Sequence, residues 1–203
     1  MKTITCRCDK SFEADIPEEL DLDQEPEALD AILEGNFLVM TCPHCGERIK
    51  PEVPIEIASR RRGLALKVVA EAERSSWMEG MRNFPDGVDV IVGYAELYER
   101  ALIIRDGLDA RAIEILKYYI LAKAMEGIAE SGDTPLVRYR GRSEDSRLSF
   151  GIEGLRQDEV ALLALPFDRY EKALRDMPAI ASSEPFSAFL FGPYKSIRAL
   201  ENL

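Results

Sequence analysis

The segment 42–46 reads Cys-Pro-His-Cys-Gly, and it decides how the first quarter of this 203-residue chain is organised. Two cysteines two residues apart, with proline after the first and glycine after the second, are typical of a metal-binding turn. Proline restricts the backbone where the turn begins, and glycine adopts the left-handed conformation that other residues resist. Backbone N–H groups can then turn toward the sulfur atoms. The segment therefore predicts a cysteine knuckle that presents Cys42 and Cys45 to one metal ion.

A second pair, Cys6 and Cys8, supplies the only other cysteines of the chain. Zinc prefers four thiolates at the corners of a tetrahedron, about 2.3 Å from the metal, and the two pairs supply that number. The 33 residues between the pairs (9–41) close a loop whose entropy cost grows only with the logarithm of its length. We therefore predict a structural zinc ion held by Cys6, Cys8, Cys42 and Cys45.

Other chemistries use similar residues and stay open at this point. A Cys-Pro-His-Cys motif also occurs in strongly oxidising thioredoxin-fold proteins, where the first cysteine begins a helix. Gly46, Pro51 and Pro54 argue against a long helix here, and that fold leaves the first cysteine pair unexplained. A rubredoxin-like iron site uses two short cysteine pairs, and their spacing does not separate iron from zinc. Free thiols are a further alternative.

The segment between the cysteine pairs is strongly acidic. Residues 1–57 hold 14 acidic and 5 basic residues, and ten of the acids lie within 13–34 without a lysine or arginine. Such a surface repels nucleic acid and anionic membranes. It indicates a solvated acidic loop or a surface for a basic protein partner. Four of the five basic residues flank the cysteines and would compensate the −2 charge of a zinc–thiolate centre, unless this is ordinary surface placement: Arg7, Lys10, Arg48 and Lys50.

The pattern of the chain changes near residue 58. We expect a zinc-ribbon-like module over residues 1–57 and a mixed α+β domain over 58–203, so the fold class is α+β. Helices are expected over 28–33, 94–104, 109–129, 167–177 and 194–202, with a short one before residue 85. Strands are expected over 37–40, 64–71, 88–92, 136–140, 148–152, 160–165 and 186–191. Asp109 is the expected N-cap of the longest helix.

These motifs resemble the CpXC proteins, a bacterial and archaeal family named for its paired cysteine motifs and without an assigned activity. The resemblance rests on residues 4–8, 27–35 and 41–46, with a weaker likeness over 90–97 and 107–117. The family pattern has Cys-Pro-x-Cys twice, whereas the first pair here is Cys6-Arg7-Cys8, which is one residue shorter and lacks the proline. The resemblance implies metal binding by the four cysteines, and it implies no reaction.

Signals of catalysis are missing from the sequence. His44 is the only histidine, and we expect it to point to solvent from within the knuckle. A catalytic zinc ion keeps one position open for water, whereas four cysteines close the coordination shell. The segment 192–196 ends like a phosphate loop but lacks the glycine before its lysine. We therefore expect no enzymatic activity, no catalytic residues and no organic cofactor.

Three functions fit these observations. The first is a zinc-stabilised structural protein that binds another protein or itself. The second is a nucleic-acid-associated zinc-ribbon protein, which would use the arginines of 60–62 and 138–147, with Tyr139 available to stack on a base. The third is a rubredoxin-like iron electron carrier.

The expected location is the cytoplasm. Charged residues interrupt the apolar stretches before the ~20 residues that a membrane span needs. The N-terminal residues lead directly into a polar segment with no apolar signal-peptide core. A reducing compartment also disfavours structural disulfides between the four cysteines. We therefore expect a cytoplasmic protein with no membrane partner.

Overall fold

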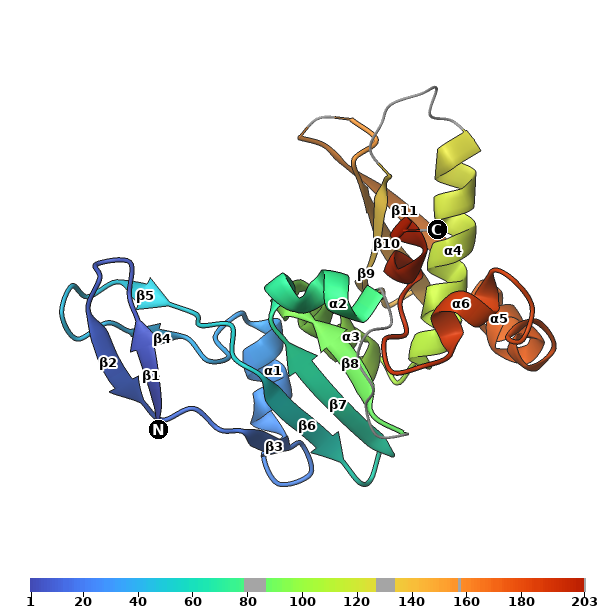
Figure 1. The fold of residues 1–203 in the computed structure, drawn as a ribbon. Helices are drawn as coiled ribbons and strands as arrows, with labels where there is room; N and C mark the ends of the chain where they lie inside the picture. The colour runs from blue at the N-terminus through green and yellow to red at the C-terminus, as the bar shows by residue number, and fades with distance from the viewer. Residues whose placement is uncertain (79–86, 127–133, 157, 203) are drawn as a thin grey trace. The chain divides into compact units, whose positions relative to one another are not determined.

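A computed structural model describes residues 1–78, 87–126, 134–156 and 158–202, which divide into two compact units (Figure 1). The first unit comprises Met1–Ser75 and Phe84–Tyr98, and the second comprises Ser76–Asn83 and Glu99–Leu203. The mixed helix and strand content expected from the sequence is confirmed. The boundary expected between residues 57 and 58 falls inside a strand, β6 (Ile55–Ser59), so it is not where the compact units divide.

Two small hairpins carry the cysteine pairs in their turns (Figure 1). In the first, β1 (Lys2–Thr5) pairs antiparallel with β2 (Ser11–Ala14). In the second, β4 (Met40–Thr41) pairs antiparallel with β5 (Arg48–Ile49). Neither hairpin buries a core of its own, because two short strands cannot cover each other's apolar side chains.

The strand expected over 37–40 is wrong except at its last residue. Residues 37–39 instead form a turn that follows the helix α1 (Glu27–Leu33). The N–H of Phe37 donates to the carbonyl of Ala31 at 2.9 Å, and that of Val39 donates to Asn36 at 3.1 Å. Leu38 lies in the left-handed region with φ of 57°. The helix expected over 28–33 is confirmed, and it buries Ala28 and Ile32, which are four residues apart on one face.

A four-stranded sheet forms the core of the first unit. Its order is β3-β6-β7-β8, from β3 (Glu19–Asp21), β6, β7 (Leu64–Val69) and β8 (Asp89–Val92). β3 runs parallel to β6, β7 runs antiparallel to β6, and β8 runs parallel to β7. Ile55 and Ile57 are buried while the residues between and beside them alternate outward, as a strand with one covered face requires. The strands expected over 64–71 and 88–92 are confirmed.

Asp23 joins β3 to the turn between β6 and β7. One carboxylate oxygen accepts the hydroxyl of Ser59 at 2.6 Å, and the other accepts the N–H of Arg61 at 2.9 Å. The Asp23 side chain is only 8% exposed. Both hydrogen bonds favour the ionised carboxylate, and together they hold the pKa of Asp23 below its ordinary value.

The two hydrogen bonds of Asp23 predict that the protein loses stability in acid. A carboxyl group whose pKa is lower in the folded state contributes stability above its unfolded pKa and loses it as the pH falls through the folded value. We expect Asp23→Asn to destabilise the protein near neutral pH and to remove part of the decline in stability below about pH 4. Urea unfolding at several pH values measures this, with exposed Asp15→Asn as the control. An unchanged pH dependence in Asp23→Asn would contradict it.

The second unit is built on an antiparallel sheet of order β11-β10-β9. The strands are β9 (Leu136–Arg142), β10 (Arg147–Glu153) and β11 (Val160–Pro166), at the three positions expected. Helix α4 (Ala110–Glu126) packs on β9 and on α5 (Phe167–Ile180). Asp109 caps α4, since its Oδ1 accepts the N–H of Arg111 at 2.8 Å. The expected end of this helix, 127–129, lies outside the described residues.

Helix α3 (Gly93–Arg105) follows β8 along the chain and confirms the helix expected over 94–104. The short elements η1 (Glu71–Glu73) and α2 (Arg74–Met78) begin where a short helix was expected, and residues 79–86 lie outside the described part. Among the described residues, no helix combines the length and apolar character needed to cross a bilayer.

The strand expected over 186–191 is wrong, because this segment forms α6 (Phe186–Leu190). Phe186 and Phe189 are three residues apart, so a helix brings both rings to one face, where they pack on Tyr118. The ring centroids lie 5.1 and 5.8 Å from that of Tyr118. The chain then ends in a 3₁₀ helix, η2 (Ile197–Asn202), within the region where a helix was expected.

Candidate metal centre

The first cysteine pair lies in a tight turn between β1 and β2. The N–H of Cys6 donates to the carbonyl of Lys10 at 2.9 Å, and the N–H of Asp9 donates back to the carbonyl of Cys6 at 2.9 Å. Asp9 takes the left-handed conformation, with φ of 62°. Aspartate tolerates this region better than most residues, because its short polar side chain can bond locally.

The second pair lies in a turn of the same design with one residue more. The N–H of Cys42 donates to the carbonyl of Glu47, and the N–H of Gly46 donates to the carbonyl of Cys42, both at 2.9 Å. Gly46 has φ of 76°, which explains the glycine of the motif. Asp9 and Gly46 therefore hold equivalent positions, and the missing residue of the first motif shortens its turn without removing a ligand.

The turns bring the four cysteine sulfurs together, all within 4.8 Å of one another. Two sulfur pairs join the hairpins: Cys6 to Cys45 at 3.7 Å and Cys8 to Cys42 at 3.9 Å. Thiolates that surround zinc tetrahedrally at 2.3 Å are separated by about 3.8 Å. A disulfide requires about 2.05 Å, and all four cysteines are free. The residues present therefore fit a tetrahedral metal ion with four sulfur ligands.

Backbone N–H groups point at the sulfurs and change the thiol pKa values. At Cys42, burial raises the pKa, but the N–H groups of His44 and Cys45 outweigh it and the pKa is lowered to about 7. At Cys6, the N–H of Cys8 lowers the pKa, whereas burial and the neighbouring thiols raise it to about 12. The thiol of Cys42 thus ionises readily, whereas the pKa values of Cys6 and Cys45 are raised, because adjacent negative charges repel. A bound cation removes this conflict, which favours a metal ion at the centre of the cluster.

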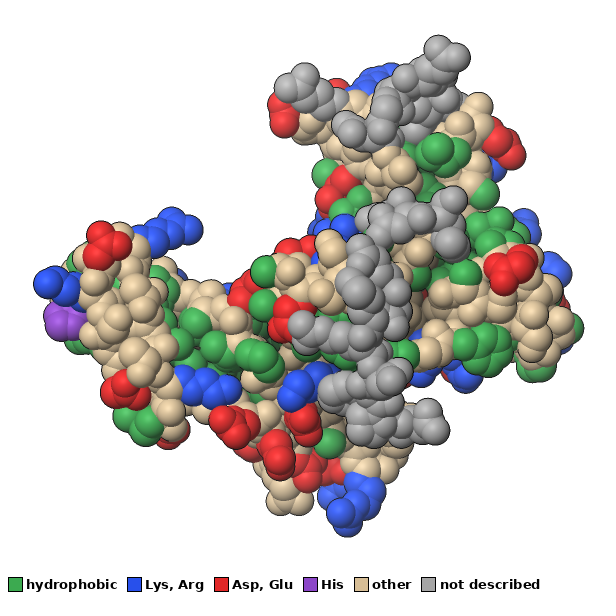
Figure 2. All heavy atoms as spheres, viewed as in Figure 1, with side chains coloured by type: hydrophobic (Ala, Val, Ile, Leu, Met, Phe, Trp, Pro, Cys, Tyr) green, Lys and Arg blue, Asp and Glu red, His purple; other side chains and the backbone are tan. Residues whose placement is uncertain are grey.

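The cluster is partly shielded from water. Cys6 and Cys42 are buried, Cys8 is half-buried and Cys45 is exposed. His44 is exposed as expected, and it appears in purple in Figure 2. With four sulfurs around one point, a tetrahedral ion has no open position for water or a substrate.

Three basic residues beside the cysteines contact side chains other than the cysteine sulfurs. Arg7 lies 3.8 Å from the carboxylate of Glu47, and Lys50 lies 4.3 Å from the ring centroid of Tyr94. Arg48 donates to Asn36 at 3.4 Å. Glu47 also approaches the cluster, since its Oε2 lies 3.8 Å from the sulfur of Cys6. These contacts of Arg7, Arg48 and Lys50 are therefore with groups other than the sulfurs, and charge compensation of a metal centre stays a prediction.

Several arginines of the two clusters contact acidic groups within the protein. Arg61 and Arg62 lie at Asp23, the first through its N–H and the second at 3.9 Å. On β9, both Arg138 and Arg140 pair with Glu153, at 3.6 and 2.7 Å. Tyr139 is 1% exposed, so the expectation that it stacks on a base is wrong. Alternation along β9 explains this, because arginines on one face leave the tyrosine on the other, in the core.

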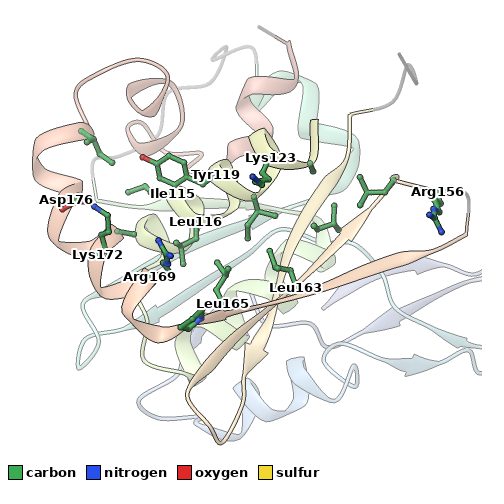
Figure 3. A pocket seen from close by; sticks show the side chains of 17 residues that line it. Ile115, Leu116, Tyr119, Lys123, Arg156, Leu163, Leu165, Arg169, Lys172 and Asp176 are labelled. Atoms are coloured by element: carbon green, nitrogen blue, oxygen red, sulfur yellow. Dashed lines mark hydrogen bonds and ion pairs between the residues drawn. The ribbon is translucent and has the colours of Figure 1, made fainter. Parts of the chain in front are cut away.

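A second candidate site is a cavity of about 1130 Å³ in the second unit, between α4, α5 and the face of β10 and β11 (Figure 3). Leu116 of α4 and Leu163 and Leu165 of β11 belong to its apolar lining. No sequence motif marks it, because its walls come from four segments that meet only in the fold. Its charged lining residues are Lys123, Arg156, Arg169, Lys172 and Asp176.

Comparison of this chain with known proteins and protein families agrees with the cysteine pattern. The model of the family described as CpXC protein matches residues 4–117. An uncharacterized protein of Treponema pallidum (strain Nichols) is 28% identical over 218 residues, covering 98% of this chain and 97% of that protein. No solved structure matches the chain. The matched range includes all four cysteines.

Proposed function

We propose that this chain, which belongs to the CpXC family, is a zinc-stabilised structural protein that acts by binding another protein or a second copy of itself. One observation supports its metal-binding part: the sulfurs of the two hairpins pair crosswise at the separations of a tetrahedral zinc–thiolate centre. The hairpins form a zinc-ribbon-like module in this proposal. The zinc ion holds the two turns together, and its closed ligand shell leaves no position for catalysis at the metal.

The small size of the two hairpins favours a structural zinc ion over a redox-active iron. An electron carrier needs a redox-active metal, whereas a structural zinc ion needs only closure of the fold. Here the metal would join two hairpins that have little apolar core, so a structural contribution is the need that the fold itself presents. Soft thiolate ligands suit either metal, and composition analysis therefore decides between them.

The first test is elemental analysis of the purified, untagged protein. We expect one zinc per chain, a colourless protein, and loss of the metal in a Cys42→Ser and Cys45→Ser double variant. His44→Ala is the matched control, because it lies between the same cysteines and is exposed; it should keep its zinc. Stoichiometric iron with reversible bleaching on reduction would contradict zinc, and a metal-free protein would contradict the site.

A further inference from the structure

The sheet of the second unit has two edges, and one of them is closed by side chains. Along β9, the N–H of Tyr139 donates to Glu99 Oε1 at 2.7 Å, and the N–H of Arg142 donates to Asp106 Oδ2 at 3.1 Å. A register shift between Ser149 and Phe150 interrupts the pairing of β10 with β9. Caps, charged residues and irregularities of this kind keep a sheet edge from pairing with another chain.

The opposite edge, β11, has fewer of these features among the described residues: near its end, Arg147 Nη2 donates to the carbonyl of Ala164 at 2.9 Å, and Pro166 is its last residue. Its strand partner in that part of the chain is β10, with an unbroken register from Arg147↔Pro166 to Glu153↔Val160. β11 contains no charged residue. Leu162 is 79% exposed and Val160 is 48% exposed. A long, regular and apolar edge strand is a template for another strand.

We infer that β11 pairs with the β11 of a second copy of this chain, antiparallel about a two-fold axis. The two sheets then form one sheet of six strands, and the same residues meet from both sides, as a two-fold interface requires. The inference rests on the proposed function, since it identifies the protein partner as a second copy.

The charges at the two ends of β11 favour an antiparallel pair of identical strands. The segment before the strand, 156–159, carries a net charge of −1. The end of the strand carries +1 from three residues: Arg147 opposite Pro166 on β10, and Asp168 and Arg169 after it. In the antiparallel pair the acidic end of each strand meets the basic end of the other, whereas a parallel pair would bring like charges together. The uncharged centre adds no repulsion.

Both faces of β11 gain cover in this arrangement. Leu163 and Leu165 line the cavity, so Leu162 and Ala164 point to the other face, because side chains alternate along a strand. Pairing places a second set of the same apolar residues beside each of them. The apolar sheet face that lines the cavity in Figure 3, with Leu163 and Leu165, then continues into the sheet of the second copy.

The charge of the second unit also suits self-association. Residues 76–83 and 99–203 hold 18 acidic and 16 basic residues, whereas residues 1–75 and 84–98 hold 19 and 10. Two copies that meet through the second unit therefore join units of nearly neutral net charge.

The test is the mass of the zinc-loaded, full-length protein in solution. Light scattering after size exclusion and sedimentation equilibrium should find a dimer at about 50 µM. Leu162→Lys places two cations at the seam between the two β11 strands. It should raise the dissociation constant of the dimer at least about tenfold. The side chain is exposed, so folding does not depend on it. Leu174→Lys is the matched control, because Leu174 is 40% exposed on α5 and outside β11; it should leave the dimer intact.

The outcomes separate this inference from the proposed function. A monomeric wild-type protein that contains one zinc overturns the β11 seam alone. A dimer that Leu162→Lys leaves intact, or that Leu174→Lys dissociates, overturns it as well. A wild-type protein without zinc contradicts the proposed function, whatever its mass. A dimer dissociated by Leu162→Lys, with zinc content and circular dichroism unchanged, supports the seam.

Discussion

Stripping the metal from the wild-type protein should unfold the two N-terminal hairpins and leave the second unit folded. β4 and β5 contain two residues each, and β1 and β2 contain four. Isolated hairpins of this size are marginal in water. Structural zinc supplies on the order of 10 kcal/mol or more of apparent binding free energy, which becomes folding free energy. Without it, the two hairpins lose the link that joins their turns, while the pairing of β3 with β6 still holds the chain between them.

Hydrogen exchange measured by mass spectrometry locates the effect. After chelation, the amides of residues 2–14 and 40–49 should lose protection, while those of β9, β10 and β11 keep theirs. The Cys42→Ser and Cys45→Ser variant should reproduce this pattern without chelator, and His44→Ala should not. Unchanged exchange in both hairpins after complete metal removal would show that the fold holds them without the ion.

Much of this centre could be predicted from the sequence because its determinants are local. The Cys-Pro-x-Cys-Gly turn depends on residues within one segment, and Gly46 has the positive φ that its place in the motif implies. The same holds for α4, where Asp109 and a regular apolar spacing set the start and the buried face. The three strands of the second unit were also correctly placed, since short apolar runs between turn residues mark them.

Other features depend on contacts between distant segments and left no local signal. The parallel pairing of β3 with β6 joins residues 19–21 to 56–58. The role of Asp9 was missed because aspartate in place of glycine hides the likeness of the two turns. At 186–191 the aromatic residues favour a strand by propensity, but packing on Tyr118 selects the helix α6. The cavity and the exposed edge of β11 emerge only from the assembled sheet.

A buried lysine holds the second unit together and could not be distinguished from surface charge by sequence. Lys117 is 3% exposed, and its Nζ lies 2.8 Å from Glu114 Oε1 and 3.0 Å from Glu99 Oε1. Each carboxylate also accepts a backbone N–H: Glu99 from Tyr139 on β9, and Glu114 from Ile197 at the start of η2. One cation thereby balances two acids that fix a strand and the C-terminal segment.

Replacing this cation should be among the most damaging single changes in the chain. Lys117→Met keeps the length of the side chain but leaves two buried carboxylates without a positive charge. Breaking a buried ion pair in this way costs about 3–5 kcal/mol of unfolding free energy. Urea unfolding near pH 7.5, followed by circular dichroism, measures the loss. A change below about 1 kcal/mol would contradict the prediction, because it would mean that the carboxylates are stable without the lysine.

The pH dependence identifies the cause of the damage. Burial raises the pKa of Glu114, and Lys117 opposes this rise. Burial lowers the pKa of Lys117, but Glu114 and Glu99 outweigh it and raise that pKa, so the lysine stays charged. Without Lys117 the pKa of Glu114 should rise further, which penalises the folded state above the unfolded pKa of the acid and spares it below. The deficit of Lys117→Met should therefore shrink as the pH falls from 7.5 toward about 4.

A triple variant separates unpaired charge from lost packing. Glu99→Gln and Glu114→Gln keep an oxygen that can accept the N–H groups of Tyr139 and Ile197, but they carry no charge. Added to Lys117→Met, they should restore much of the stability near neutral pH, because replacing a buried ionic group entirely by neutral residues is often harmless. The pH dependence of the single variant should disappear as well. If the triple variant is no more stable than Lys117→Met, the lysine acts through its packing rather than its charge.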